Sequence, residues 1–430
     1  MPSPNIIAKY LIETPQPVEQ AAEIIAGEQS SGTFLAVPGE TEELKARARA
    51  KVIAVKMLEA VDTPSLRGSR APKSSEGTGR PIPIQNQYQR AEITIEFPFD
   101  NVGVNLPTLL ATVCGNLYEL ADHSGCKLLD VELPEAYAER YPGPQFGGEG
   151  TRRLAGVWKR PIIGTIVKPS VGLTPKQTAD LVRELGEAGI DFVKDDELMA
   201  DPPHSPLKDR VEQVMGEIRR LADKTGRKVM YAVNITDEID AMKRHHDIVL
   251  KAGGTCVMVS LNHVGLAGVS ALRTHSQLPI HGHRNGWGLY ARHPLLGIEF
   301  TAYQKFWRIA GVDHLHVNGL KNKFWEPDES VVRSIQEMRK EIFGGYHAMP
   351  VVSSGQWGGQ APETYRQTQT LDLMYVAGGG IMAHPGGPAA GLRGIQQAWE
   401  AAEKGIALED YAREHEELRQ TIEKFGRLRE

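Results

Sequence analysis

Short apolar runs alternate with amphipathic segments throughout the chain after about residue 145. Eight of these runs are typical of strands, at 161–168, 191–195, 229–235, 256–261, 279–284, 313–317, 350–354 and 372–377. Helical spacing between most of them predicts helices at 175–188, 206–224, 239–252, 299–310 and 328–342. This alternation predicts a parallel (β/α)8 barrel with C-terminal helices over residues 145–430. An open doubly wound sheet is the alternative, which eight units and the lack of a GxGxxG motif after the first strand disfavour.

The first 140 residues show shorter elements without a regular period, which predicts a smaller α+β domain over 1–140. Strands are expected at 5–13 and 91–98, and helices at 18–27 and 105–120. Between them, residues 62–86 are rich in Gly, Pro and Ser without an apolar period, which indicates a loop.

Composition narrows the class of protein. The chain has 430 residues, with 49 Lys and Arg against 54 Asp and Glu, and this net charge of −5 without a basic stripe argues against a nucleic-acid partner. Its 3 cysteines have no CxxC spacing, which argues against a disulfide framework and a thiolate zinc site. We find neither a signal-peptide pattern nor an apolar run long enough to span a membrane, so we expect a cytoplasmic protein.

Polar and charged residues follow most of the predicted strands at their carboxyl ends, where a barrel carries its chemistry. Packing alone does not explain such residues at five or six successive strand ends. They are Lys168 and Ser170, the tetrapeptide 194–197, His281, His283 and Arg284, His314 and His316, Ser353 to Gly355, and Gly378 to Gly380.

The tetrapeptide Lys194, Asp195, Asp196 and Glu197 is a candidate metal site. Alternation along a strand puts Lys194 and Asp196 on one face and Asp195 on the other, and Glu197 at the strand end can turn inward. An ion-pair network is one interpretation. The other is a Mg²⁺ site, since carboxylate oxygens suit that ion. The lysine becomes a third anionic ligand if its neutral amine takes up CO2 as a carbamate.

In their order along the chain, five of these segments resemble the barrel motifs of the RuBisCO superfamily. They are GTIVKP at 164–169, GIDFVKDDE at 189–197, HGHR at 281–284, DHLH at 313–316 and GGGIMAHP at 378–385. Upstream, GEQSSGTF at 27–34 resembles the N-terminal-domain motif that reaches a partner's active site, and Gly115 with Asn116 resembles the segment of the catalytic asparagine. The resemblance therefore extends over almost the whole chain.

This resemblance implies a role for each matching residue. Lys194 would be carbamylated and bind Mg²⁺ with Asp196 and Glu197, while Lys168 would act as the acid and base at the enolised carbon. His283 would lie near the substrate hydroxyls. One phosphate site would comprise Arg284 and His316, and the other would comprise Ser353, Gly355, Gly379 and Gly380 with Thr33 of the partner subunit. Glu28 and Asn116 would complete the catalytic set from the N-terminal domain.

Several positions depart from the pattern of true carboxylases. Ser170 replaces a second lysine, Trp287 replaces a histidine of the fifth strand motif, and Phe34 replaces a tryptophan. The sixth loop, VNGLKNKFW at 317–325, differs as well but keeps Lys323 at the position of the lysine that faces CO2. These departures predict a RuBisCO-like protein that does not fix CO2.

The RuBisCO-like branch includes several reactions, and we favour decarboxylation of a phosphorylated 3-oxo sugar acid such as 3-oxo-isoapionate 4-phosphate. Lys323 suits a substrate carboxylate about to leave as CO2, although it could instead close the loop over a phosphate. The alternatives are 2,3-diketo-5-methylthiopentyl-1-phosphate enolase, methylthioribulose-phosphate isomerase, and a non-catalytic phosphometabolite sensor. A complete Lys, Asp and Glu set disfavours the sensor, which has no need to bury that charge.

The resemblance also implies a homodimer, or a larger assembly of such dimers, of chains with a ferredoxin-like domain before the barrel. Each site would combine one barrel with the N-terminal domain of the partner. Other residues are interpreted as structural: His245 and His246 as solvated, Met258, Met374 and Met382 as core, Trp307 as core, and Cys256 as lying at the amino end of its strand.

Overall fold

The computed structural model describes residues 4–32, 38–67, 69 and 87–426. Thr33 and Phe34, and most of the predicted loop 62–86, lie outside these described residues. The chain divides into two compact units: Met1–Tyr141 with Gly286–Phe306, and Pro142–Asn285 with Trp307–Glu430. The segment 286–306, which follows the fifth predicted barrel strand in sequence, therefore belongs to the first unit.

The first unit is built on a five-stranded sheet with the order β10-β4-β1-β3-β2. In chain order its elements are β1 (Ile6–Thr14), α1 (Val18–Glu28), α2 (Glu42–Ala48), β2 (Lys51–Met57), β3 (Gln89–Phe97), α3 (Leu106–Val113), β4 (Gly125–Glu132), α4 (Tyr137–Arg140), α10 (Trp287–Ala291) and β10 (Leu296–Ile298). The β1, β2, β3 and β4 strands pair antiparallel with α1 and α3 between them, which is the ferredoxin-like βαββαβ arrangement. β10 joins β4 in parallel.

Alternation explains how this sheet forms its core. In β1, Ile6, Ala8, Tyr10 and Ile12 are fully buried, and each faces the same side of the sheet because side chains alternate along a strand. The predicted helix over 105–120 is shorter than expected. It ends at Val113, since the backbone of Gly115 leaves the helical region (φ −87°, ψ −130°) before a 3₁₀ turn at Asn116–Tyr118.

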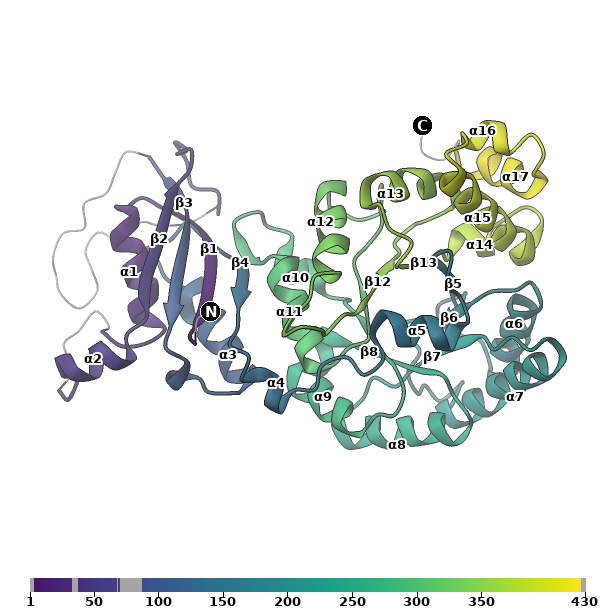
Figure 1. The fold of residues 1–430 in the computed structure, drawn as a ribbon, viewed down its shortest axis with the longest axis horizontal. Coiled ribbons are helices and arrows are strands. Elements are labelled where there is room, and N and C mark those ends of the chain that lie inside the picture. The colour runs from purple at the N-terminus through teal and green to yellow at the C-terminus, as the bar shows by residue number, and fades with distance from the viewer. Residues whose placement is uncertain (1–3, 33–37, 68, 70–86, 427–430) are drawn as a thin grey trace. The chain divides into compact units, whose positions relative to one another are not determined.

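The second unit contains a closed barrel whose described strands follow the order β11-β12-β13-β5-β6-β7-β8-β9 (Figure 1). All neighbouring pairs are parallel. The strands are β5 (Ile162–Ile166), β6 (Phe192–Lys194), β7 (Met230–Asn234), β8 (Cys256–Ser260), β9 (Ile280–His283), β11 (His314–His316), β12 (Met349–Val352) and β13 (Met374–Val376). Each predicted barrel strand is confirmed, and the doubly wound alternative is wrong because the sheet closes.

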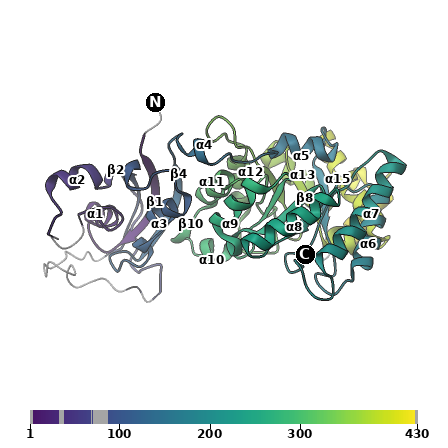
Figure 2. The same ribbon diagram turned by 90° about the horizontal axis from the view of Figure 1, so that it is seen from below.

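Helices lie outside these strands, as is also visible after a 90° turn about the horizontal axis of Figure 1 (Figure 2). The helices are α5 (Gly147–Ala155), α6 (Pro175–Glu187), α7 (Leu207–Thr225), α8 (Ile239–Lys251), α9 (Leu261–His275), α11 (Phe300–Ala310), α12 (Asp328–Met338), α13 (Ala361–Thr368), α14 (Gly379–Met382), α15 (Gly387–Lys404), α16 (Leu408–Tyr411) and α17 (Glu416–Phe425). Of these, α11 continues from the first unit, and α16 and α17 pack on α15. The five helices predicted between barrel strands are confirmed within a few residues.

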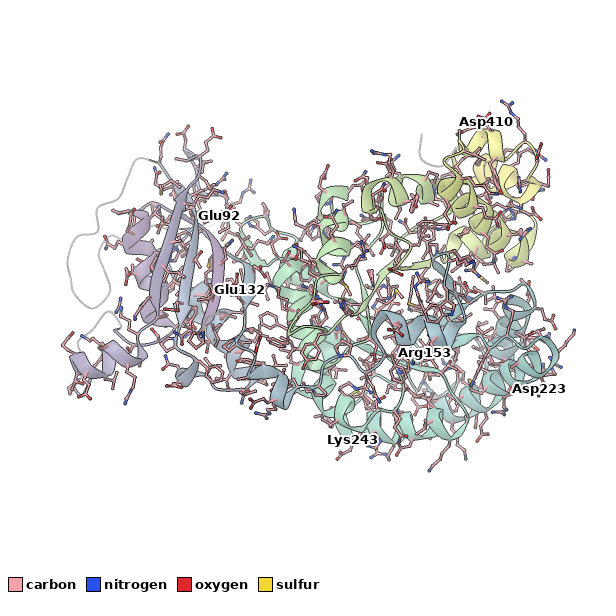
Figure 3. All side chains as sticks on the ribbon, viewed as in Figure 1. Glu92, Glu132, Arg153, Asp223, Lys243 and Asp410 are labelled. Carbon is pink, nitrogen blue, oxygen red and sulfur yellow. The ribbon has the colours of Figure 1, made fainter. Side chains whose placement is uncertain are left out.

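The outer helices are amphipathic. α7 buries Val211, Val214 and Ile218 at helical spacing, whereas the side chain of Asp223 on the same helix is exposed (Figure 3). The barrel interior contains an apolar cluster that includes Phe192 and two of the predicted core methionines, Met258 and Met374, whereas Met382 is half-buried. Of the residues that the structure describes, no helix is both long and apolar enough to cross a membrane.

The prediction that His245 and His246 are solvated is wrong, since only 12% of the His245 side chain is exposed. His246 is fully buried rather than solvated, because its ring closes contacts between α8 and α9. The Nδ1 of His246 lies 3.0 Å from Oδ1 of Asp247, and the same oxygen lies 2.7 Å from Nε2 of His275. The Nε2 of His246 accepts a hydrogen bond from the Gln277 N–H at 3.2 Å. The His246, Asp247 and His275 ligand atoms lie within 4.8 Å of one another. Both His246 nitrogens are engaged, so the cluster has a structural role.

Candidate active site

Lys168, Asp196 and Ser170 meet where β5 and β6 end. Lys168 follows β5, and its Nζ donates to Oδ2 of Asp196 and to Oγ of Ser170, both at 2.7 Å. Ser170, which departs from the carboxylase pattern, is therefore a direct partner of the predicted acid and base. Lys168 retains substantial exposure, with 38% of its side chain accessible, whereas Asp196 is buried. The lysine is thus anchored and still open to the barrel mouth.

Lys194 is the last residue of β6 and is almost completely buried. Its Nζ donates to the Asp195 carbonyl oxygen at 2.8 Å and lies 3.6 Å from Oε2 of Glu197. Burial lowers the pKa of Lys194, although the charges of Glu197, Asp196 and Asp195 oppose that effect. A lowered pKa favours the neutral amine, which is the form that reacts with CO2.

Glu197 also faces His283, since the Oε2 of Glu197 lies 3.5 Å from Nε2 of His283. Burial, together with the charge of Lys194, lowers the pKa of His283 to about 4. His283 is thus a neutral imidazole near pH 7, held by an Asn285 side chain 3.1 Å from its Nδ1. The sequence-predicted residues Lys168, Lys194, Asp196, Glu197 and His283 therefore form one cluster. Its two carboxylates, together with Lys194 as a carbamate, fit the donor chemistry of a Mg²⁺ site.

A layer beneath this cluster positions its backbone. Asn234, the last residue of β7, donates from Nδ2 to the carbonyl oxygens of both Asp196 and Glu197 at 3.2 Å. Asp195 points to the opposite side, as alternation predicted. There it accepts from Tyr231 Oη and from the Asn234 N–H at 3.0 Å, with Arg210 at 3.4 Å. Our sequence reasoning missed Asn234, although a polar residue ending an apolar strand is a usable signal.

Three histidines on β9 and β11 lie at the centre of a chain of hydrogen-bonded side chains that begins at Thr151 and ends at Ser353. Thr151 on α5 donates to the Gly147 carbonyl oxygen, so its hydroxyl must accept from Nε2 of His314 at 2.7 Å. The Nδ1 of His314 is then an acceptor for Nδ1 of His281 at 3.3 Å. In turn, Nε2 of His281 accepts from Nε2 of His316 at 2.8 Å.

The chain ends at Ser353, whose hydroxyl donates to Nδ1 of His316 at 3.0 Å. The Gly147 carbonyl oxygen can only accept a hydrogen bond, so it determines the direction of every hydrogen bond in the chain and, with it, the tautomer of each histidine. Burial lowers the pKa of His281 and His316 far below the usual value, and it lowers the pKa of His314 to about 3. These rings are neutral. His316 ends its strand as predicted, but His314 begins β11 and His281 lies within β9, so the prediction that these two residues lie at carboxyl strand ends is wrong. The sequence did not indicate the connection between the rings.

Two glycine-containing loops lie against one another after β12 and β13. A Cβ on Gly380 would lie 2.4 Å from the Gln356 carbonyl oxygen, so only glycine permits this approach. A Cβ on Gly379 would meet no atom within 4 Å, which leaves its backbone accessible. Gly355 has a φ of +80°. A Cβ on Gly378 would lie 3.8 Å from Cε of Lys168, which connects this glycine cradle, 355 and 378–380, to the Lys168 cluster.

The loop after β11 is anchored on the same side of the barrel. Gln356 donates to the Leu320 carbonyl oxygen at 3.1 Å, and the Lys323 N–H donates to the Ser354 carbonyl oxygen at 3.2 Å. The Lys323 side chain is exposed, with Nζ 5.2 Å from the centre of the Phe324 ring. The loop backbone is thus fixed to Ser354 and Gln356, while the Lys323 ammonium lies on the surface of its loop.

Within the first unit, Glu28 and Asn116 come together. The Asn116 Nδ2 donates to Oε1 of Glu28 at 3.5 Å, joining the end of α1 to the turn after α3. Thr33 lies outside the described residues. The two predicted N-terminal site residues that are described therefore form a pair of their own.

The catalytic-domain model of the ribulose bisphosphate carboxylase large chain matches residues 149–425. The chain belongs to the RuBisCO large-chain family. Within the RuBisCO family, the 3-oxo-isoapionate-4-phosphate decarboxylase of Rhizobium etli is 49% identical over 98% of this chain and 99% of its own. The 3-oxo-isoapionate-4-phosphate transcarboxylase/hydrolase of Xanthobacter autotrophicus is 48% identical over the same shares of the two chains. A rubisco-like protein from Burkholderia fungorum has a solved structure with a TM-score of 0.88 and 44% identity, covering 98% of this chain and 100% of that one.

These comparisons confirm the predicted RuBisCO-like family and the barrel fold. They also bear out the preferred reaction class, because the relatives from Rhizobium etli and Xanthobacter autotrophicus carry the names of enzymes acting on 3-oxo-isoapionate 4-phosphate. The names favour an enzyme over a sensor, and decarboxylation over the methylthio enolase or isomerase. The assignment of individual RuBisCO-family roles to site residues stays a prediction.

Proposed function

We propose that this protein decarboxylates a phosphorylated 3-oxo sugar acid, with 3-oxo-isoapionate 4-phosphate as the first candidate. The observation that carries the proposal is the cluster of Lys168, Lys194, Asp196 and Glu197 at the carboxyl ends of β5 and β6. Its residue types suit a reaction in which negative charge develops on an oxygen. The decarboxylase name of a relative 49% identical over nearly the whole chain supports the choice of substrate class.

Lys194 as a carbamate, Asp196 and Glu197 would hold a Mg²⁺ ion. When bound, that ion supplies a positive charge that polarises the substrate oxo group and stabilises the developing negative charge. Support comes from the buried Lys194 amine with its lowered pKa and from the two adjacent carboxylates. Asn234 keeps the backbone of both carboxylate residues in place.

The chemistry at carbon would depend on Lys168. The bond between the carboxylate carbon and its neighbour breaks, CO2 leaves, and the electron pair passes to the oxo group to give an enediolate. Lys168 then donates a proton from Nζ to the carbon that lost CO2, and Asp196 and Ser170 orient that amine through two of its hydrogens. Neutral His283 can exchange hydrogen bonds with the substrate hydroxyls without adding charge.

The remaining contacts concern the two ends of the substrate. The glycine cradle has accessible backbone at Gly379 and suits the phosphate, because backbone N–H groups can approach it closely. Lys323 would meet the carboxylate.

Glu28, Asn116 and Thr33 of the partner subunit would complete each site in a homodimer. A cytoplasmic location stays a prediction from the sequence.

The direct test is CO2 release from 3-oxo-isoapionate 4-phosphate, measured with and without preincubation in bicarbonate and Mg²⁺. We expect full activity only after preincubation, and loss of activity in Lys194→Ala with the circular dichroism spectrum retained. Ribulose 1,5-bisphosphate with labelled bicarbonate should give no labelled phosphoglycerate. Turnover of the methylthio-diketopentyl phosphate alone, or full activity in EDTA, contradicts the proposal.

The second candidate function is a transcarboxylase/hydrolase reaction on the same substrate, which the name of the Xanthobacter relative supports. Product analysis separates the two. A decarboxylase releases one CO2 for each substrate consumed and retains the remaining carbon skeleton in one phosphorylated product. Substrate consumption without an equivalent amount of free CO2 would favour the transcarboxylase/hydrolase reaction.

A further inference from the structure

Arg284, at the end of β9, forms a buried ion pair with a residue of the β11 loop. Its Nη2 lies 2.6 Å from Oε2 of Glu326, and the two side chains are only 5% and 2% exposed. The resemblance to carboxylases implied that Arg284 binds a substrate phosphate. In this chain a carboxylate from the protein itself already faces that guanidinium.

Glu326 is held by more than this one contact. The Asn318 Nδ2 donates to the same Oε2 at 2.6 Å, and the Ser330 hydroxyl donates to Oε1 at 3.0 Å. Three donors from three different segments thus satisfy the carboxylate. A phosphate that displaced Glu326 from Arg284 would leave a buried carboxylate without its cationic partner, which is strongly unfavourable.

His316, the other residue expected at this end, is also engaged. Its Nε2–H donates to His281, and its Nδ1 accepts from Ser353. A neutral ring whose single N–H is already donated offers no hydrogen bond to a phosphate. Arg284 and His316 therefore both have protein partners where a second phosphate would need them.

We propose that Glu326 determines substrate specificity by neutralising Arg284, so that the site takes substrates with one phosphate and rejects bisphosphates. The single phosphate binds at the glycine cradle, and the Arg284 end accepts an uncharged, hydroxyl-bearing part of the substrate. This proposal rests on the proposed function for the location of the site and defines its substrate class further. Rejection arises because a second phosphate would face the Glu326 carboxylate.

The test compares binding of ribulose 5-phosphate and ribulose 1,5-bisphosphate by calorimetry. In the wild type we expect the bisphosphate to bind no more tightly than the monophosphate. Glu326→Gln keeps the shape of the side chain and removes its charge, so we expect the preference for the bisphosphate to rise by about 10-fold or more. The matched control is Glu329→Gln, which removes the same charge from an exposed position three residues away and should leave the preference unchanged.

A double variant identifies the cation responsible. Arg284→Met combined with Glu326→Gln should lose the gain in bisphosphate binding, because the guanidinium freed by the single change is then absent. An unchanged preference in folded Glu326→Gln overturns the proposal. Should that variant not fold, the wild type decides: tighter binding of the bisphosphate than of the monophosphate overturns the proposal, whereas equal or weaker binding supports it.

These readouts are independent of the reaction. If CO2 release from 3-oxo sugar acids fails while Glu326→Gln gains bisphosphate affinity, the proposed function is wrong and the role of Glu326 stands. If CO2 is released but the preference does not change, only the role of Glu326 is wrong.

Discussion

At the scale of single residues, buried neutral histidines distinguish the interior of this barrel. His314 is fully buried, and burial lowers its pKa from an ordinary value near 6.5 to about 3. The unfolded chain therefore binds a proton that the folded chain does not, between about pH 6.5 and pH 3. The contribution of this residue to the free energy of unfolding is therefore fully present above about pH 6.5 and is lost as the pH falls from about 6.5 to about 3.

We expect the free energy of unfolding to fall on acidification, with each such histidine contributing about 1.4 kcal/mol per pH unit within the window. His314→Gln should reduce this slope between about pH 6 and pH 4.5 by one such contribution, whatever its effect on stability at pH 7. Urea unfolding at a series of pH values measures the slope. His347→Gln, at an exposed position, is the control, and an identical slope in His314→Gln and wild type would contradict the expectation.

Asn234 illustrates a residue that acts through its neighbours. It contacts the backbone of Asp196 and Glu197 rather than the carboxylates themselves, so its removal should loosen the proposed metal site without removing a ligand. We expect Asn234→Ala to raise the Mg²⁺ concentration needed for half-maximal activity by about 10–100-fold, as for other residues that support metal ligands. Excess Mg²⁺ should restore most of kcat. Loss of activity that no Mg²⁺ concentration restores would instead indicate a wider structural defect.

At the scale of elements, the loop from Val317 to Trp325 differs most clearly from the carboxylase pattern. Its backbone is anchored to Gln356 and Ser354, so it has a defined position beside β12. The Lys323 ammonium is nevertheless exposed. Its proposed contact with a substrate carboxylate requires the side chain to turn toward the barrel when substrate binds.

Lys323→Met should therefore lower kcat/KM for a 3-oxo sugar acid phosphate by about 10²–10³-fold, because a desolvated charge partner of the carboxylate is removed. Lys321→Met is the matched control, since Lys321 is an exposed lysine of the same loop. It should reduce kcat/KM far less. Equal small effects of the two changes in steady-state kinetics would mean that Lys323 only helps to close the loop.

At the scale of the whole molecule, the predicted site residues are divided between the two compact units. Glu28 and Asn116 lie in the first unit, and Lys194 lies in the second. If each site joins one barrel with the partner's N-terminal unit, residues of the two units can be supplied by different chains.

Mixing inactive Asn116→Ala with inactive Lys194→Ala should restore part of the activity, because a hybrid dimer contains one site with both native residues. Mixing Asn116→Ala with Glu28→Ala is the matched control. Both changes lie in the first unit, so every hybrid site retains a defect and activity should not return. Failure of the first mixture after verified subunit exchange would show that each site is built within one chain.

Local patterns in the sequence determined the barrel and much of its site. Apolar runs and helical spacing depend on neighbouring residues, so the barrel strands and the helices between them could be predicted to within a few residues. Alternation within 194–197 similarly predicted that Lys194 and Asp195 face opposite ways. The Lys168, Lys194, Asp196, Glu197 and His283 cluster followed, since parallel strands bring their carboxyl ends together.

Only the tertiary structure decided which distant residues satisfy one another. The Arg284 and Glu326 pair joins residues 42 positions apart, and His246 is buried because Asp247, His275 and Gln277 surround its ring. The segment 286–306 joins the first unit because β10 pairs with β4. Hydrogen bonds and ion pairs of this kind have no period along the chain. Their partners are fixed by packing, which no local pattern specifies.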